Sequence, residues 1–141
     1  MRVQFAKWFK GNPDAIHFAE CLWHAAQEWD DLEDEGKADT DRLLSWLAFG
    51  KEYHPFFHTH AAVLRPAMLV MHLQWKAANV LDHGTRADVD KSYMLRAGIY
   101  GVWHMMAWAV GGQDWAEEIG PEIYRTYSET PDDIWREFNN A

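Results

Sequence analysis

The stretch Asn12–Gly36, NPDAIHFAECLWHAAQEWDDLEDEG, contains a helix and the signals for both of its ends. Asn12 followed by Pro13 is typical of a helix start, because an asparagine side chain accepts a free backbone N–H and proline fits the first helical position. Gly36 is typical of a helix end, because glycine readily adopts the left-handed backbone that closes many helices. The residues that share the apolar face are Phe18, Leu22, Ala26 and Trp29. The stretch therefore predicts an amphipathic helix over residues 13–35.

Similar signals divide the rest of the chain into helices. They are expected over residues 39–50, 55–65, 66–84, 88–110, 114–128 and 131–139, with Pro66, Gly111-Gly112 and Gly120-Pro121 as interruptions. No segment alternates apolar and polar residues with β-branched enrichment, so no sheet is expected. The prediction is an all-α protein: one domain over residues 1–141, an orthogonal or up-down bundle of five or six helices, with the helix over 88–110 at its centre.

The composition of the chain disfavours several classes of function. Nine Trp, seven Phe and five Tyr among 141 residues supply enough large side chains for a folded core. A net charge of −9 disfavours direct nucleic-acid binding, which begins with Lys and Arg neutralising phosphates. No apolar run matches a membrane span, and the first residues lack the apolar run of a signal peptide. The single cysteine, Cys21, excludes an internal disulfide, so the expected location is a reducing cytoplasm.

An acidic pattern, Asp30-Asp31-x-x-Asp34, lies near the end of the helix over 13–35. Carboxylates one turn apart can hold Mg²⁺, which in turn binds phosphate or diphosphate, and class I isoprenoid synthases use a similar pattern. Helical rotation places Asp30 and Asp34 at the border of the core face and predicts that both are shielded. Asp30, Asp31 and Asp34 are therefore candidate ligands of a divalent metal such as Mg²⁺. The alternative is that they are polar groups hydrogen-bonded between helices.

The opposite face of the same helix carries a polar stripe of His17, Glu20, His24, Glu28 and Asp31. Four of its members, His17, Glu20, His24 and Asp31, have a spacing that could converge on one ion. A solvated face is the alternative, because a single helix supplies the whole set.

The apolar helix over 66–84 carries one polar stripe, made of Arg65, His72, Lys76 and Asn79. One interpretation is that this stripe is the solvent edge of a central helix. The other is that it binds a ligand, with Lys76 or Arg65 pairing with Asp30, Asp34 or an anionic group.

The long helix over 88–110 carries a third stripe, made of Tyr93, Arg96, Tyr100 and His104. Tyr100 is a candidate ligand-binding residue and His104 a candidate acid–base group, although most buried histidines are satisfied by a tyrosine hydroxyl or a backbone carbonyl. Gly98 and Gly101 are costly inside a helix unless another element or a ligand approaches closely.

Three histidines, His54, His58 and His60, surround the turn at Pro55-Phe56. The spacing of two of them suits a pair of metal ligands, but no third ligand is implied nearby. A structural turn is the alternative.

Several of these residues together resemble a family of small helical proteins of tailed bacteriophages and prophages. The resemblance rests on Trp29-Asp30-Asp31-Leu32 with Asp34, Pro55-Phe56 with His60 and Leu64, Pro66, Trp75 with Ala77-Ala78-Asn79 and Leu81, Gly111-Gly112 with Trp115-Ala116, and Pro121-Glu122-Ile123. The chain departs from that pattern at His54, where an Asn is expected. The resemblance implies a helical fold, a viral origin and the host cytoplasm, and it implies no activity.

Two main functions follow from these patterns. The first is a small acidic phage-type accessory protein that binds another protein, with a homo-oligomer also compatible. The second is a metal-dependent helical-bundle enzyme or binding protein for a phosphorylated compound, in which Asp30 and Asp34 hold Mg²⁺ and Asn79 adds an amide ligand. Lys76 or Arg65 would then neutralise the phosphate. A virion structural role is a third hypothesis. An exposed aromatic patch would favour the first function, and an enclosed polar pocket between the helices over 13–35, 66–84 and 88–110 would favour the second.

Overall fold

We describe the protein from a computed structural model, which covers residues 1–139 and, at residues 48 and 49, the backbone alone. The helices are α1 (Arg2–Trp8), α2 (Pro13–Glu35), α3 (Thr40–Ser45), the π-helical turn η1 (Trp46–Gly50), α4 (Lys51–Tyr53), α5 (Pro55–Leu81), α6 (Arg86–Leu95), α7 (Gly98–Arg125) and α8 (Pro131–Asn139). No strand occurs over residues 1–139, and the all-α prediction is confirmed.

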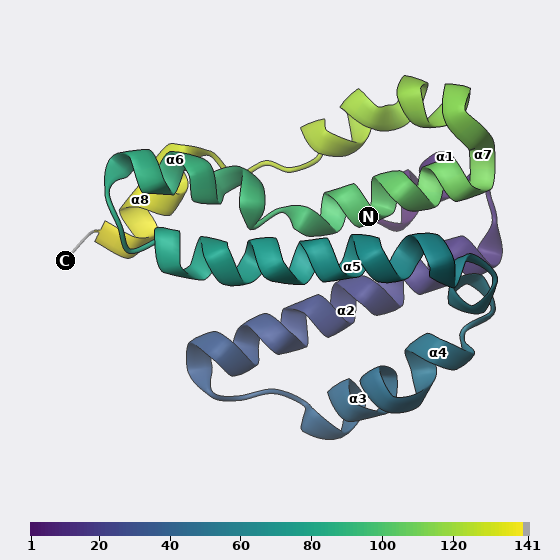
Figure 1. Cartoon of the computed structure of the whole chain (residues 1–141), viewed down its shortest axis with the longest axis horizontal. Coiled ribbons are helices and arrows are strands. Elements are labelled where there is room, and N and C mark those ends of the chain that lie inside the picture. The colour runs from purple at the N-terminus through teal and green to yellow at the C-terminus, as the bar shows by residue number, and fades with distance from the viewer. Residues whose placement is uncertain (140–141) are drawn as a thin grey trace.

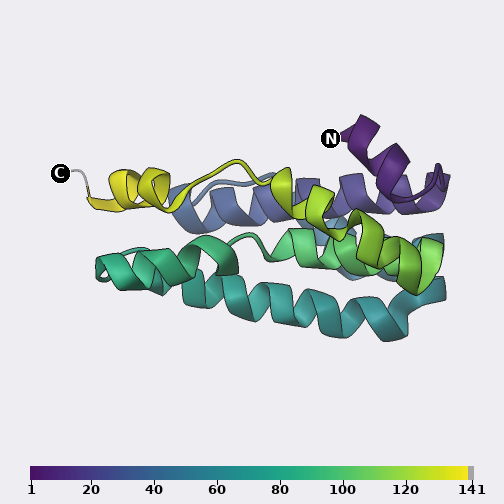
Figure 2. The same ribbon diagram turned by 90° about the horizontal axis from the view of Figure 1, so that it is seen from above.

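Helix α5 forms an outer layer of the bundle. It crosses the molecule in front of α2, with α3 and α4 along one edge and α7 along the opposite edge (Figure 1). Figure 2 shows the first half of α7 between α5 and α2. Helix α5 packs chiefly against α6 and α7, and less extensively against α2 and α4.

The ends of α2 lie where local chemistry predicts them. The side chain of Asn12 accepts from the backbone N–H of Ala15 at 3.0 Å, and Pro13 occupies the first turn. Gly36 has φ 67° and donates its N–H to the carbonyl of Leu32. The predicted bounds of this helix are confirmed, as are those of α8.

Proline does not divide α5. The chain was expected to break at Pro66, but the helix continues through it and departs from helical geometry only at His60, where φ is −114° and ψ is 20°. Packing against α6 and α7 outweighs the missing N–H of Pro66.

The expected long helix over 88–110 is instead two helices. Helix α6 begins one residue after Thr85, whose hydroxyl accepts from the N–H of Asp88 while the Asp88 carboxylate accepts from the N–H of Thr85. It ends at Leu95, and α7 starts at Gly98. A Cβ added at Gly98 would lie 3.1 Å from Cα of Met71, so the break brings the backbones of α7 and α5 together.

Helix α7 bends where the sequence predicts an end. Gly112 has φ 84° and ψ −175°, a conformation that glycine alone adopts readily, so the predicted interruption at Gly111-Gly112 is confirmed. The second half of α7 then runs past Gly120-Pro121 to Arg125. The predicted division at Gly120-Pro121 is therefore wrong. The two halves of α7 fold back on each other at Gly112, as Figure 1 shows.

Helix α1 has no counterpart in the sequence prediction. It buries Phe5 and Trp8, and the carbonyl of Trp8 accepts from the indole N–H of Trp115 at 2.9 Å. Lys7 pairs with Glu122 at 2.6 Å, which ties α1 to the second half of α7. No side chain caps the start of α1, so tertiary contacts hold this short helix.

Replacing Gly98 by alanine tests the close contact between α5 and α7. We expect Gly98→Ala to lower the free energy of unfolding by about 1–2 kcal/mol, because the new methyl meets backbone atoms that cannot move aside alone. Gly101→Ala is the matched control: its Cβ would meet nothing closer than the Tyr124 hydroxyl at 3.9 Å. Alanine there should stabilise the helix by about 0.5–1 kcal/mol. Urea unfolding measures both, and equal effects of the two changes would contradict the contact.

Candidate functional site

A chamber of about 690 Å³ lies between α2, η1, α5 and the start of α7. It brings together residues of three separate predicted patterns: Asp30 of the acidic pattern, His72 of the α5 stripe, and Arg96 and Tyr100 of the third stripe. Sequence periodicity could not predict this convergence, because it identifies helix faces and not their neighbours.

Aromatic rings form much of the chamber wall. They are Trp23 and Trp29 from α2, Trp46 from η1, Trp75 from α5, Tyr100 from α7 and Tyr127 from the segment after α7. The rings of Trp29 and Trp75 are 6.4 Å apart and inclined by 66°, and His72 lies 6.1 Å from Trp29. Tyr100 and Tyr127 are 5.4 Å apart.

The π-helical turn η1 supplies one side of this wall. The sequence predicts a helix end at Gly50, but Gly50 has right-handed helical φ and ψ, and the chain continues directly into α4. Trp46, Leu47 and Lys51 thereby reach the chamber. Trp46 could not be predicted because no local sequence signal indicates a π-helical turn, although such turns are frequent at functional sites.

Asp30 is the acidic group of the chamber whose environment most disfavours its charge. Partial burial raises its pKa above the ordinary value of 3.8, and the charges of Asp34 and Asp31 raise it further. Arg96 opposes this increase. Ionisation of Asp30 therefore costs free energy in the folded state unless a cation approaches the carboxylate.

The other two residues of the acidic pattern lie outside the chamber. Asp31 and Asp34 are exposed, so the prediction that Asp34 is shielded is wrong. Over residues 1–139 no three His, Cys, Asp or Glu side chains are arranged to hold a metal ion. The geometry therefore gives no support to an Mg²⁺ site at Asp30, Asp31 and Asp34, or to one at His17, Glu20, His24 and Asp31.

The two cationic side chains of the α5 stripe, Arg65 and Lys76, form ion pairs with glutamates. Arg65 pairs with Glu52, and Lys76 pairs with Glu33 at 3.1 Å. Neither therefore pairs with Asp30 or Asp34, the carboxylates that the ligand-binding interpretation offered as partners. Both cations are exposed, which fits the solvent-edge interpretation, while Asn79 is half-buried and does not line the chamber.

His104 joins the two halves of α7. Its Nε2 lies 2.8 Å from the carbonyl of Ala116, and its Nδ1 lies 3.1 Å from the hydroxyl of Tyr124. Because a carbonyl only accepts, Nε2 carries the proton and Nδ1 accepts from Tyr124. Both nitrogens are therefore occupied, and the arrangement favours a structural role over the acid–base role.

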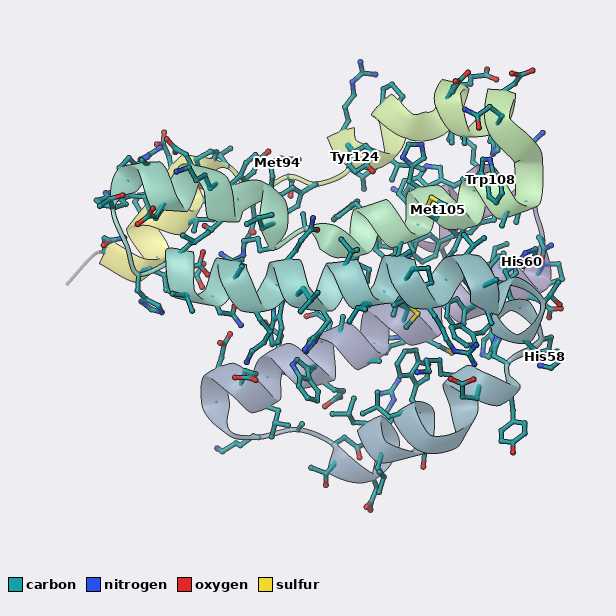
Figure 3. The ribbon with its side chains drawn as sticks, in the orientation of Figure 1. His58, His60, Met94, Met105, Trp108 and Tyr124 are labelled. Atoms are coloured by element: carbon teal, nitrogen blue, oxygen red, sulfur yellow. The ribbon has the colours of Figure 1, made fainter. Side chains whose placement is uncertain are left out.

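The histidine-rich turn contributes to a hydrogen-bonded chain. His54 caps α5, with Nδ1 accepting from the N–H of Phe56 at 3.2 Å. Its Nε2 then donates to Nδ1 of His17 at 2.9 Å, and Nε2 of His17 lies 3.6 Å from the sulfur of Cys21. His58 and His60 lie farther along the start of α5 (Figure 3). The structural-turn interpretation therefore accounts for His54.

A second hollow, of about 1040 Å³, lies on the other side of α5. It is lined by α5, the end of α6 and both halves of α7, and its surface is mainly apolar. Met71, Met94 and Met105 contribute flexible side chains to it, together with Tyr124. Figure 3 shows Met94, Met105 and Tyr124 along the same side of α5.

The outward side of α5 extends this hollow as an exposed apolar surface. Leu69 and Leu73 are each 58% exposed, and Val80 is 76% exposed. Together with the half-exposed Val70 they follow the three- and four-residue spacing of one helix face. We call the combined surface of Leu69, Val70, Leu73, Val80, Met94, Met105 and Tyr124 the α5 face.

Comparisons with known proteins add no further assignment. The chain matches no protein-family model, no curated protein and no solved structure. Among residues 1–139, no helix combines the length and the apolar character that crossing a bilayer requires.

The raised pKa of Asp30 predicts how stability varies with pH. Its neutral form is favoured by folding, so the stability it contributes is present below pH 3.8 and is lost as pH rises through the raised pKa. Asp30→Asn should therefore raise the melting temperature at pH 7, with a difference that shrinks as pH falls toward 4. Glu118→Gln, at an exposed carboxylate of α7, is the control and should show no gain. A lower melting temperature for Asp30→Asn at pH 7 would contradict this account.

The pKa of His54 predicts the opposite trend. Burial lowers it below 6.5 and His17 lowers it further, so folding favours the neutral ring, and stability is lost as pH falls below 6.5. Asn at this position can accept from the N–H of Phe56 without titrating, so His54→Asn should lose less stability between about pH 7 and pH 5.5. Thermal melts across this range measure the effect. His58→Asn, at an exposed histidine, should keep the wild-type profile, and an unchanged profile for His54→Asn would refute the role of His54.

Proposed function

We propose that this chain acts by binding another protein, and that the α5 face is its binding surface. The observation that carries the proposal is the exposure of Leu69, Leu73 and Val80 along one side of a long helix. Apolar side chains gathered on one face cost solvation free energy in the isolated protein, and such patches commonly mark binding surfaces.

The shape of the α5 face favours a helix as the occupant. An apolar hollow runs beside α5 and is bounded by both halves of α7. An amphipathic helix can place its apolar residues in such a groove and leave its polar side in solvent. Met71, Met94 and Met105 suit this mode, because the unbranched, polarisable methionine side chain adapts its shape to a partner.

The alternative functions receive less support from the geometry. The cations expected to neutralise a phosphate, Arg65 and Lys76, are each paired with a glutamate. Over residues 1–139 no group of potential metal ligands converges, which leaves the Mg²⁺-dependent hypothesis without its central element. The viral origin, the host cytoplasm and a virion structural role stay predictions from the sequence.

Substituting the two central leucines tests this proposal. Leu69→Asp/Leu73→Asp should weaken the complex with the partner by about 100-fold or more, because it places charge at the centre of an apolar interface. The partner is identified by photo-cross-linking from p-benzoylphenylalanine at position 73 in cells that make the protein, and the dissociation constant is then measured with both purified proteins. Both leucines are exposed, so the melting temperature should change little.

Val3→Asp is the matched control. Val3 is 83% exposed, and its helix, α1, lies across the bundle from α5 in Figure 2. This change should leave the dissociation constant unaltered, and a cross-linker at position 3 should not capture the same partner. Three results would refute the proposal: no adduct specific to position 73, a dissociation constant unaffected by the leucine variant, or sedimentation of the wild-type chain as a dimer that this variant dissociates.

A further inference from the structure

We propose that the chamber between α2, η1, α5 and α7 binds an organic cation, an ammonium group attached to an apolar body. The site is separate from the α5 face, and the inference does not depend on the proposed protein partner. It rests on the aromatic wall, the balance of charge and the size of the chamber.

The wall offers aromatic rings from five parts of the chain. Trp29 and Trp75 stand edge to face at 6.4 Å, and Tyr100 and Tyr127 lie 5.4 Å apart, while Trp23 and Trp46 supply two further rings. The negative faces of such rings attract ammonium groups, and tryptophan attracts them most strongly. Rings collected from α2, η1, α5 and α7 can surround a ligand, which a stripe on one helix cannot do.

The charge balance of the chamber favours a cation. Lys51 and Arg96 reach the wall, but each lies beside a carboxylate, and Lys51 shares its carboxylate, Glu52, with Arg65. The Nζ of Lys51 is 3.5 Å from Glu52, and Nη1 of Arg96 is 3.8 Å from Asp82.

Asp30 has no such ion-pair partner, and the charge of Arg96 acts on it only from beyond ion-pair distance. Within residues 1–139 no Lys, Arg or His side chain lies at ion-pair distance from it, and its neighbours Asp31 and Asp34 add negative charge. Glu129, the second carboxylate of the chamber, accepts from the hydroxyl of Tyr127 at 3.0 Å. Asp30 and Glu129 therefore line the chamber without a cation at ion-pair distance among residues 1–139, and an ammonium group beside Asp30 would supply a counter-charge.

The chamber is large enough for more than a bare ammonium ion. Its volume of about 690 Å³ falls in the range of pockets that take organic ligands. Leu22, Leu43, Met68 and Met71 add apolar surface beyond the aromatic rings. The ligand class is accordingly an alkylammonium or arylammonium compound with an apolar body.

Three probes of similar size test this assignment by titration calorimetry. They are benzyltrimethylammonium, its uncharged carbon isostere neopentylbenzene, and the anion phenyl phosphate. We expect saturable binding of the cation, with shifts in the NMR indole signals of Trp29 and Trp75. The isostere should bind at least about tenfold more weakly, because it lacks the cation–π attraction and the attraction to Asp30.

Two variants test the role of the carboxylates. Asp30→Asn and Glu129→Gln should each weaken the cation about tenfold, whereas Glu118→Gln should leave its affinity unchanged. Asp30→Asn is expected to raise the melting temperature at pH 7, so a loss of binding in this variant would not arise from unfolding. Leu69→Asp/Leu73→Asp should bind the cation normally, which separates this inference from the proposed function.

Several results would overturn the assignment. They are no saturable binding of the cation up to about 10 mM, equal affinity for cation and isostere, tighter binding of phenyl phosphate, and full affinity in Asp30→Asn.

Discussion

The packing of other rings around Trp103 is the interaction on which the bundle depends. Its indole is fully buried in the first half of α7. The surrounding rings are Phe5 at 5.0 Å, Trp8 at 6.1 Å, Trp23 at 5.9 Å and Tyr100 at 5.0 Å. These contacts join α1 and α2 to α7, and removing one such buried ring typically costs roughly 3–5 kcal/mol. They make the first half of α7 the central layer, with α2 on one side and α5 on the other.

The position of α5 follows from that arrangement and accounts for both proposed sites. One side of α5 faces the chamber through Met68, His72 and Trp75, and another faces the groove through Pro66, Val70 and Gln74. Its third side carries Leu69, Leu73 and Val80, which no other described part of the chain covers. Apart from its polar stripe, α5 is apolar nearly all round, and apolar helix faces are normally buried. The exposure of these three side chains is therefore the feature that most needs a functional explanation.

Local signals in the sequence predicted the ends of some helices correctly and the ends of others wrongly, and each outcome has a physical reason. The ends of α2 and α8 were predictable because caps such as Asn12 act within one turn. Helix α1 was not, because its contacts with α7 are more than 100 residues away in sequence. Pro66 and Pro121 were expected to end helices, but tertiary packing carried the helix through both. The lining of the chamber could be predicted only in part. Asp30, His72 and Tyr100 were candidates, whereas Trp46 and Trp75 reach the chamber only because of how the helices are arranged in space.

The uncovered α5 face is the central element of this account, and carbene footprinting of side chains tests it most directly. A diazirine reagent labels apolar side chains in proportion to their contact with solvent. In the free protein Leu69, Leu73 and Val80 should be labelled strongly, as should Val3. In the complex with the partner the three α5 side chains should lose their label while Val3 keeps it. Weak labelling of the α5 face in the free protein, or equal labelling in the complex, would contradict the account.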